Sequence, residues 1–534
     1  MTADGASVAA ESSVSPSSSS SSSWLPPILV VGASALFFFA LRRFAQRKRT
    51  KLSLNDSKLA KTGHRWLTFT AAEPGSVYCN RCASGVLEGF ECAFCTAKAD
   101  CTRCAYEMSL EVACKAQQRI EEDEEGDGTT VATLQHYWVR GNIPYPSASC
   151  TVCSEPVGAG VGLRDLRCIW CNLTAHDRCR ERVDAHCTRG DLAAALLPPK
   201  LVDTRKAGSR HQKHLIIDRV YPPRDVEGFT PIVVLVNSSS GSGAGGELMH
   251  RLQALLHPVQ VVDVLKSNVP AVLRWCADDS RTDPKTCNPR VLIAGGDGTV
   301  SLVLNDIDDL GERRPPAAIF PLGTGNDLSR MLGWGEQADA VDVDCRELLK
   351  QVTRAVPVDI DRWRVHITSP RRLGVMPVSR LVSMTNYVSI GVDACVTFGM
   401  QSTRSSLVPS SLSSRFLNKL LFFTFGTKDV FEHACANLQN KLELEVDGTK
   451  IDLPEIEGLC FLNISYWGAG VWGKDTEPRQ DPSDGLFEVF AVRSSFHIAQ
   501  LQSDGEAWMQ PAPATLTVEH RGKSRLLIKR RERT

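Results

Sequence analysis

The sequence predicts a multi-domain fold. Two small, zinc-bound α+β cysteine-rich domains precede a two-lobe unit, whose first lobe is α/β and Rossmann-like and whose second lobe is mostly antiparallel β. Three observations support this prediction. Thirteen of the 19 cysteines lie between Cys79 and Cys187, many in the paired spacing of zinc ligands. Apolar strand patterns that end in glycine-rich loops alternate with helical patterns through 229–370. Strand patterns such as 441–446 and 459–464 recur within 371–534.

Length and charge limit the possible functions. The 534 residues suffice for about three or four domains, and 43% hydrophobic residues can supply real cores. The 61 basic and 61 acidic residues give a formal net charge of zero, so no global field attracts DNA or RNA. We therefore expect no nucleic-acid partner.

The N-terminal stretch predicts a membrane anchor. Residues 1–23 are mostly Ser and Ala, which indicates a disordered tail. Residues 24–41 are apolar and uncharged, just long enough to span a bilayer, and a basic linker, 42–60, follows them. Because the basic residues come after the apolar run, an anchor that keeps the later domains in the cytosol is favoured over a secretory signal peptide. An interfacial helix or hairpin is the alternative. We expect attachment to the endoplasmic reticulum or the plasma membrane.

The second cysteine-rich stretch, 133–190, contains eight zinc ligands. Eight soft or borderline ligands make two tetrahedral Cys3His sites, and zinc binding supplies folding energy to a domain with little core. In a reducing cytosol such cysteines bind zinc rather than form disulfides. The ligands are His136, Cys150, Cys153, Cys168, Cys171, His176, Cys179 and Cys187.

The first cysteine-rich stretch, 61–117, repeats this pattern less regularly. Asp100 and Cys101 stand where a second histidine is expected. A thiolate is the better zinc ligand by softness, but the longer spacing leaves the choice between them open. The other ligands are His64, Cys79, Cys82, Cys92, Cys95, Cys104 and Cys114. Solvated linkers are predicted at 118–132, which is acidic, and at 191–228.

The second stretch resembles the phorbol-ester and diacylglycerol-binding cysteine-rich domain. The resemblance implies interleaved ligation and a diacylglycerol or membrane-lipid partner. Many domains of this shape are instead structural or bind proteins, so lipid capture stays open. The implied sites are His136, Cys168, Cys171 and Cys187 for one ion, and Cys150, Cys153, His176 and Cys179 for the other.

Three glycine-rich loops in 229–370 predict a phosphate-binding crevice. They follow the strand patterns 231–236, 290–293 and 317–321 and precede helical patterns. Glycines let backbone N–H groups approach phosphates, and helix N-termini add positive charge. Strand ends of one parallel sheet meet at the same crevice. A flexible Ser/Gly linker after residue 236 and a plain turn at Gly295–Gly298 are the alternatives. No Walker lysine motif occurs in these loops.

The Gly-Gly-Asp-Gly-Thr core at 295–299, the Gly-Thr-Gly-Asn-Asp segment at 323–327 and the Asn237 loop are similar to the catalytic domain of diacylglycerol and sphingosine kinases. NAD kinases share the Gly-Gly-Asp-Gly core, but the second segment and the cysteine-rich tandem favour lipid substrates. Residues 371–534 resemble the accessory part of the same family, closest to its epsilon type. The resemblance implies ATP-dependent conversion of diacylglycerol to phosphatidic acid in lipid signalling, with ATP, Mg²⁺ and up to four Zn²⁺ ions as cofactors.

The resemblance also implies roles for individual residues. Asp297, Asp327 and Asp361 would organise Mg²⁺, which prefers hard oxygen ligands; a loop or strand-end cap is the alternative role for Asp361. Asp484, with Glu488 nearby, is the best candidate for the base that deprotonates the lipid hydroxyl, and Asp297 is the alternative. The expected nucleotide contacts are Asn237, Ser238, Gly295, Gly296, Gly298, Thr299, Gly323, Thr324, Gly325 and Asn326.

One departure from the family bears on activity. Members carry further strands between the segments that match 497–500 and 504–508, which are nearly joined here. A true deletion near 500–504 would expose a sheet edge in the second lobe. Two alternative functions therefore remain: a membrane-tethered diacylglycerol-binding adaptor with an inactive kinase half, and a ceramide or sphingosine kinase. The apolar segment 416–423 is interpreted as a core helix, with lipid contact as the alternative.

Overall fold

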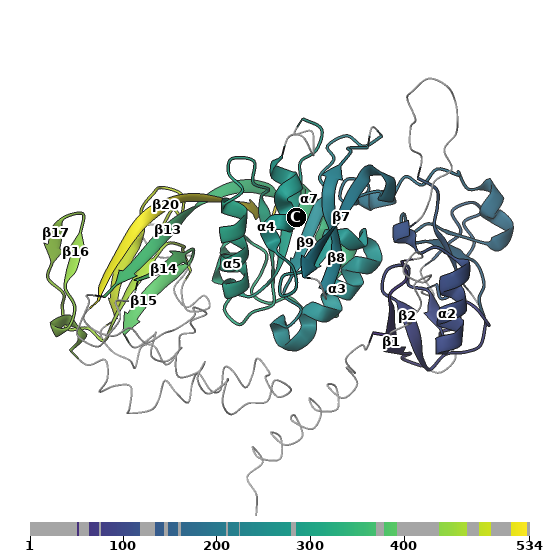
Figure 1. Ribbon diagram of the computed structural model, residues 1–534, viewed down its shortest axis with the longest axis horizontal. Helices are drawn as coiled ribbons and strands as arrows, with labels where there is room; N and C mark the ends of the chain where they lie inside the picture. The colour runs from purple at the N-terminus through teal and green to yellow at the C-terminus, as the bar shows by residue number, and fades with distance from the viewer. Residues whose placement is uncertain are drawn as a thin grey trace, which may run out of the picture. The chain divides into compact units, whose positions relative to one another are not determined.

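The computed structural model divides the chain into two compact units, Met1–Thr50 and Lys51–Thr534. All described residues belong to the second unit, and the ribbon in Figure 1 follows them. The described residues are 51–52, 63–73, 76–117, 134–143, 148–158, 162–209, 212–223, 225–278, 285–369, 379–391, 437–466, 480–492 and 514–530.

Several predictions fall on other residues. The Ser-rich tail, the membrane segment 24–41, the apolar segment 416–423 and the proposed deletion near 500–504 lie outside the described residues. Among the helices that the structure does describe, none has the length and hydropathy needed to cross a bilayer.

The catalytic half is built on a parallel sheet of four strands in the order β10-β9-β11-β12. The central strands are continuous runs of Val, Ile, Leu and Ala, as expected when helices cover both faces of a sheet. Asn268 and Asp344 cap α4 and α7 with side-chain hydrogen bonds to backbone N–H groups. The strands are β9 (Ile232–Val236), β10 (Val261–Asp263), β11 (Arg290–Gly295) and β12 (Ala317–Pro321). The helices are η6 (Ser240–Gly243), α3 (Ala244–Leu255), η7 (Pro258–Gln260), α4 (Val269–Ala277), α5 (Asp297–Asp308), α6 (Asp327–Met331) and α7 (Cys345–Arg354).

Two long strands extend this sheet beyond the α/β lobe. β13 (Val356–Thr368) and β20 (Thr515–Ile528) pair antiparallel along their length, side by side in Figure 1. β20 also pairs with β12, and β14 (Ser379–Met384) completes the seven-stranded sheet. The sheet therefore continues across residue 370, where we expected the lobe boundary, and the C-terminal strand β20 joins the sheet of the first lobe.

The second lobe is antiparallel in the residues described, as predicted. A three-stranded sheet has the order β15-β18-β19, and a separate hairpin pairs β16 with β17. Trp363 and Val365 of β13 share a core with Leu459 and Phe461 of β18. The elements are β15 (Tyr387–Gly391), η8 (Leu438–Asn440), β16 (Leu444–Val446), β17 (Thr449–Ile451), β18 (Gly458–Leu462) and β19 (Glu488–Val492).

The two cysteine-rich domains repeat one plan, three short strands followed by a helix. The first contains β1 (Trp66–Thr70), β2 (Glu88–Cys92), β3 (Lys98–Ala99), α2 (Thr102–Glu111) and η2 (Lys115–Gln117). The second contains β4 (Trp138–Arg140), β5 (Leu166–Cys168), β6 (Thr174–Ala175) and η3 (Asp177–Arg182).

The described residues within 191–228 are folded, which corrects our expectation of a linker. Ile216 and Ile217 of the hairpin in this stretch are buried in a core that also contains Trp170 of the second cysteine-rich domain and the strands of the parallel sheet. Burial of these side chains gives the stretch its order. Its elements are η4 (Gly190–Leu192), η5 (Pro199–Leu201), β7 (Val202–Ser209) and β8 (Gln212–Val220).

Candidate active site and zinc centres

The three predicted loops follow β9, β11 and β12, which are neighbours in the parallel sheet. The first loop is bonded to the second, because the Asn237 side chain donates to Thr299 Oγ1 over 2.9 Å and its backbone N–H donates to Ala294 O over 2.9 Å. The Ser/Gly stretch after Asn237 forms η6 and the start of α3, so it is not a flexible linker.

Glycines allow these loops to approach one another. A Cβ on Gly323 would lie 2.6 Å from the Cα of Gly296, which no real side chain tolerates. A Cβ on Gly245 would collide with the carbonyl oxygen of Asn237, where α3 begins against the first loop. Gly298, by contrast, is exposed, and a Cβ there would meet nothing within 4 Å. Packing against the protein therefore does not require glycine at 298.

Asp297 joins the second loop to the third and to the accessory lobe. It is the first residue of α5, and its side chain is half-buried. Its Oδ2 accepts the backbone N–H of Asn326 over 2.7 Å, and its Oδ1 accepts the side-chain amide of Asn386 over 3.0 Å. A carboxylate at a helix N-terminus is also stabilised by the helix dipole.

Asn326 organises the third loop. It is buried in the left-handed region with φ 59°, a conformation that Asn tolerates better than most residues. Its side chain bonds both the N–H and the carbonyl of Gly323 over 3.1 Å and donates to Glu336 O over 2.8 Å. The neighbouring Thr324 is half-buried and Gly325 is buried. The Asn326 side chain thus supports the loop from within.

Ser238 of the first loop contacts Asp263, which in turn contacts Lys266. The sequence analysis assigned no role to Asp263 or Lys266. The Ser238 hydroxyl donates to Asp263 Oδ2 over 2.8 Å, and Lys266 Nζ lies 2.6 Å from the same oxygen. Burial opposes ionisation, but hydrogen bonds from Lys266 and Ser238 hold the pKa of Asp263 below its usual value. The position of Asp263 in the sequence could have indicated this role, because Asp263 ends a parallel strand beside the crevice.

Asp361 pins the loop that carries Asp484. It is fully buried, and its Oδ2 accepts the Gly485 N–H over 2.7 Å. Its Oδ1 lies 2.8 Å from His520 Nε2, and its own N–H donates to Pro482 O over 2.8 Å. Asp361 thus caps the loop that carries Asp484, and its magnesium role stays a prediction.

Of the three predicted magnesium ligands, Asp297 is the one that is half-buried rather than buried. Asp327 is fully buried, with Arg330 Nε 3.9 Å from its Oδ1. In the part of the chain that the structure describes, the clustered metal-ligating side chains do not include Asp297, Asp327 or Asp361. Mg²⁺ commonly keeps several waters and takes one or two carboxylates together with substrate phosphates. The half-buried Asp297, at the loop end, suits that type of site.

The two candidate base residues lie close together in the chain. Asp484 is exposed, and its Oδ1 accepts the Leu486 N–H over 2.9 Å. Glu488 begins β19, and burial together with the charge of Asp484 raises its pKa.

Asn463 is a further residue to which the sequence analysis assigned no role. It is fully buried; its Oδ1 accepts from Trp363 Nε1 over 2.6 Å, and its amide donates to Asp361 O over 2.8 Å and to Thr385 O over 2.7 Å. Its backbone N–H donates to Asn386 O over 2.9 Å. Asn463 thus supports both Asp361 and the partner of Asp297. Its position directly after a buried strand could have indicated this role from the sequence.

Among the described residues, four side-chain clusters have the composition of zinc sites. In each, one ligand atom per residue lies within 4.8 Å of all the others, which suits a tetrahedral ion. Three are Cys3His, with the ligation pattern implied for the second domain. The fourth contains Asp100 and not Cys101. The clusters are His64, Cys92, Cys95 and Cys114; Cys79, Cys82, Asp100 and Cys104; His136, Cys168, Cys171 and Cys187; and Cys150, Cys153, His176 and Cys179.

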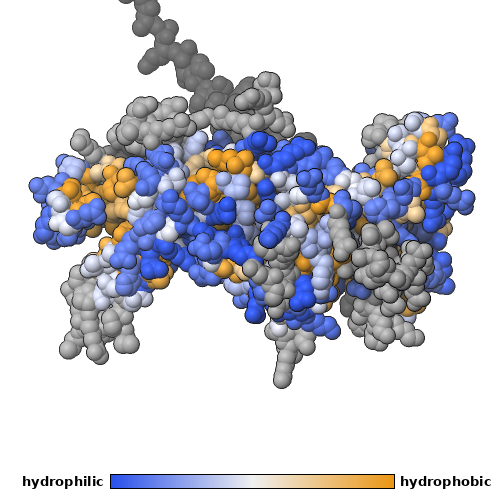
Figure 2. All heavy atoms as spheres, turned by 90° about the horizontal axis from the view of Figure 1, so that it is seen from above, coloured by the Kyte–Doolittle hydropathy of each residue, from blue (hydrophilic) through white to orange (hydrophobic). Residues whose placement is uncertain are grey.

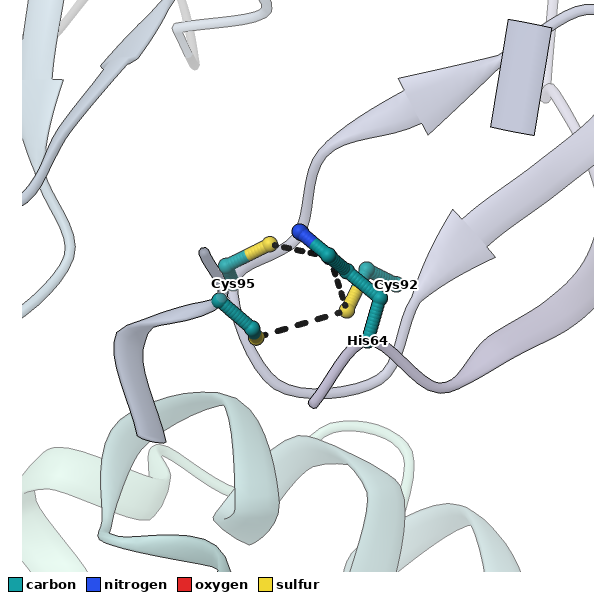
Figure 3. A group of neighbouring side chains, drawn as sticks. His64, Cys92 and Cys95 are labelled. Atoms are coloured by element: carbon teal, nitrogen blue, oxygen red, sulfur yellow. Dashed lines mark hydrogen bonds between the residues drawn. The ribbon is translucent and has the colours of Figure 1, made fainter. Parts of the chain in front are cut away.

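The histidines present Nδ1 to the sulfur atoms. Figure 3 shows His64 pointing at Cys92 and Cys95, with Nδ1 3.4 Å and 3.6 Å from their sulfurs. His64 Nε2 lies 2.9 Å from Val112 O, and His176 Nε2 lies 3.1 Å from Pro156 O. A carbonyl on the second ring nitrogen fixes the tautomer and orients the ligand. These surroundings fit zinc.

Comparisons with known proteins agree with this geometry. Residues 231–360 match the diacylglycerol kinase catalytic domain, 383–521 match the diacylglycerol kinase accessory domain, and 136–190 match the phorbol esters/diacylglycerol binding (C1) domain.

Three relatives of this chain are named as diacylglycerol kinases. Probable diacylglycerol kinase 3 of Caenorhabditis elegans is 28% identical over 89% of this chain and 65% of the relative. Diacylglycerol kinase 2 of Arabidopsis thaliana is 38% identical over 51% of this chain and 39% of the relative. Diacylglycerol kinase delta of Mus musculus is 33% identical over 57% of this chain and 23% of the relative. The chain thus spans less than two thirds of each relative.

These matches support the family as a whole, so the closer likeness to the epsilon type stays a prediction. Catalytic, accessory and C1 domains occur here in one chain, and the first two meet at Asp297. The chain therefore belongs to the diacylglycerol kinase family.

Proposed function

We propose that this protein is an ATP-dependent diacylglycerol kinase, a phosphotransferase that converts diacylglycerol to phosphatidic acid at a membrane. The observation that carries the proposal is the position of Asp297. It accepts hydrogen bonds from the third loop and from the accessory domain, through Asn326 and Asn386. A site that needs both domains is expected when one holds the nucleotide and the other presents the lipid. The names of the three relatives support the same reaction.

The glycine loops would hold ATP. Phosphoryl transfer needs positioning and charge neutralisation more than covalent chemistry from the protein. The N-terminus of α5 and the loop backbone supply N–H groups for phosphate oxygens. Lys266, whose side chain is 63% exposed beside the first loop, adds a cation. A bound Mg²⁺, for which Asp297 is the best placed residue, would neutralise charge on the phosphates.

The accessory domain would supply the base. The lipid hydroxyl oxygen forms a bond to the γ-phosphorus, the bond from that phosphorus to ADP breaks, and the hydroxyl proton moves to a carboxylate. Asp484 suits this role because its loop is pinned by Asp361 and its side chain is exposed. Asp297 already accepts two hydrogen bonds, which leaves it less able to take a proton. Glu488 is the neighbouring alternative.

The cysteine-rich domains would serve location and stability. We propose up to four zinc ions, one for each cluster. Residues 24–41 would anchor the chain, with its domains in the cytosol, at the endoplasmic reticulum or the plasma membrane. Diacylglycerol capture by the second domain would add to that anchoring.

Purified full chain in mixed micelles tests the proposal. We expect transfer of labelled γ-phosphate from ATP to diacylglycerol, and a loss of at least about 100-fold for Asp297→Ala. Asp342→Ala, which changes an exposed carboxylate of the same lobe, is the matched control and should stay active. A chain that phosphorylated only ceramide or sphingosine would replace the proposed substrate. A chain with no lipid kinase activity, but unchanged retention on diacylglycerol vesicles, would be an adaptor.

A further inference from the structure

The first cysteine-rich domain contains one cluster of a different composition from the rest. Cys79, Cys82, Asp100 and Cys104 converge, with a carboxylate where the other three clusters have histidine. We propose that Asp100 completes a Cys3Asp zinc site, and that this site exchanges its metal more readily than the three Cys3His sites. The proposal does not depend on kinase activity.

The backbone around Cys79 has the same hydrogen bonds as the backbone around Cys150 in the second domain. Cys79 N–H donates to Ser84 O, as Cys150 N–H donates to Glu155 O, each over 2.8 Å. Ala83, after the second cysteine of the pair, has φ 61°, and Ser154 has φ 62°. The two cysteine pairs are therefore presented by the same turn, although only one of the domains carries a histidine at the fourth position.

The register of the neighbouring strand places Asp100 at the position of His176. The N–H of Asn80, one residue after Cys79, donates to Lys98 O over 2.8 Å. In the second domain the N–H of Thr151, one residue after Cys150, donates to Thr174 O over 2.9 Å. Asp100 and His176 each stand two residues after that carbonyl.

Cys101 lies one residue beyond this register. It is the exposed N-cap of α2, and its side chain makes no capping hydrogen bond. Its counterpart in the second domain is Asp177, which follows the ligand His176 and is not in the cluster. The position of Asp100 therefore outweighs the preference of zinc for the softer thiolate ligand of Cys101.

The Asp100 carboxylate is suited to a cation. Its Oδ1 is buried without a hydrogen-bond partner, a costly state that a metal ion would relieve. Its Oδ2 accepts from Ser84 Oγ over 3.3 Å and from the Cys82 thiol over 3.5 Å. Zinc accepts carboxylate oxygen beside thiolates.

Two features make this site exchange more easily. Cys82 is exposed, whereas the cysteines of the other three clusters are buried or, in the case of Cys153, half-buried. A carboxylate is also a harder ligand than imidazole and matches zinc less well in a sulfur-rich site. A competing chelator can therefore reach this ion first.

Zinc release from the full chain to a colorimetric chelator tests the proposal, with total zinc measured by elemental analysis. We expect four ions per chain, one per cluster, with one of them released in a separate fast phase. Asp100→Ala should leave three ions and no fast phase. Asp100→His should keep four ions and slow the fast phase by roughly tenfold or more.

Cys101→Ser is the matched control and should leave both the zinc content and the fast phase unchanged. Loss of one ion in Cys101→Ser, with four ions retained in Asp100→Ala, would assign the ligand to Cys101 and overturn the proposal. Release of all four ions at one rate in the unmodified chain would overturn the exchange part. Asp100→His guards against misfolding as an explanation, because it restores a Cys3His site.

Discussion

At the scale of single residues, the contact between Asn386 and Asp297 offers a test of how the two kinase domains cooperate. Asn386→Asp would put a second carboxylate about 3 Å from Asp297, and a like charge disfavours ionisation. The pKa of the pair should rise, so the acidic limb of the kcat/KM profile should move to higher pH by about one unit or more. Full pH–rate profiles of both proteins measure this shift.

Asn386→Ala separates charge from hydrogen bonding. It removes the donor without adding charge, so we expect a lower rate with the acidic limb unchanged. The two variants should also differ in stability. When the pKa of a carboxyl group is raised in the folded state, the free energy of unfolding falls as the pH rises above the pKa of that group in the unfolded chain. Only Asn386→Asp should therefore become less stable as the pH rises. Identical pH profiles for the two variants would contradict this account.

At the scale of elements, Gly298 in the first turn of α5 separates packing from ligand binding. A Cβ there meets no protein atom within 4 Å, so Gly298→Ala should stabilise the helix by about 0.4–1 kcal/mol. The same Cβ would occupy space that the proposed site reserves for nucleotide phosphate. We therefore expect higher thermal stability together with a KM for ATP raised by several-fold.

Gly85→Ala is the control for this prediction. Gly85 also has open space around its Cβ position but lies in the first cysteine-rich domain. Its substitution should leave the KM for ATP unchanged. If Gly298→Ala also left the KM unchanged, the second loop would not contact the nucleotide.

The loop between Asp484 and β19 exposes an apolar side chain beside the candidate base. Leu486 is 65% exposed, and its N–H donates to Asp484 Oδ1. Figure 2 shows apolar residues among hydrophilic ones on the surface of the described part. If Leu486 contacts the lipid, Leu486→Ser should weaken the free energy of lipid binding by up to about 1.5–3 kcal/mol, because an apolar side chain is no longer buried there.

The expected result is lower activity on diacylglycerol vesicles, with activity on a short-chain, water-soluble diacylglycerol preserved. Leu381→Ser, on β14, is the matched control because its side chain is 64% exposed. Equal losses in the two variants would argue against a specific lipid contact at Leu486.

At the scale of the whole molecule, the zinc domains and the catalytic domain share structure. Trp170 lies in the same core as the parallel sheet, and Lys115 Nζ donates to Ala254 O of α3 over 2.8 Å while lying 4.9 Å from the Trp170 ring centroid. Complete zinc removal should therefore lower the melting temperature of the catalytic domain by roughly 2–4 °C for each kcal/mol lost. Calorimetry with and without a strong chelator measures this change.

Zinc added back should restore the original melting temperature, which separates zinc loss from chelator damage. A catalytic transition that kept its temperature in the chelated protein would mean that the shared core contributes little. This experiment removes all the zinc, whereas Asp100→Ala is expected to remove one ion and leave three.

Local sequence patterns predicted the parts of this protein that are set by short stretches of chain. Apolar runs followed by glycines predicted β9, β11 and β12 with their loops, because strand and helix periodicities extend over only a few residues. Ligand spacing predicted fifteen of the sixteen residues in the four metal clusters and narrowed the last to Asp100 or Cys101. Family likeness added the individual nucleotide contacts within these loops and the base candidates.

Contacts between residues far apart in the chain required the three-dimensional structure. Asp361 and His520 are 159 positions apart, yet their side chains lie 2.8 Å from each other, and Asp361 also accepts the Gly485 N–H of the loop that carries Asp484. β20 pairs with β12 and β13, so the end of the chain completes the catalytic sheet, and the expected linker folds because its apolar side chains find a shared core. Strand register places Asp100, and not Cys101, in the cluster with the thiols of the first domain. Register and burial arise from pairing between segments, and no local pattern encodes them.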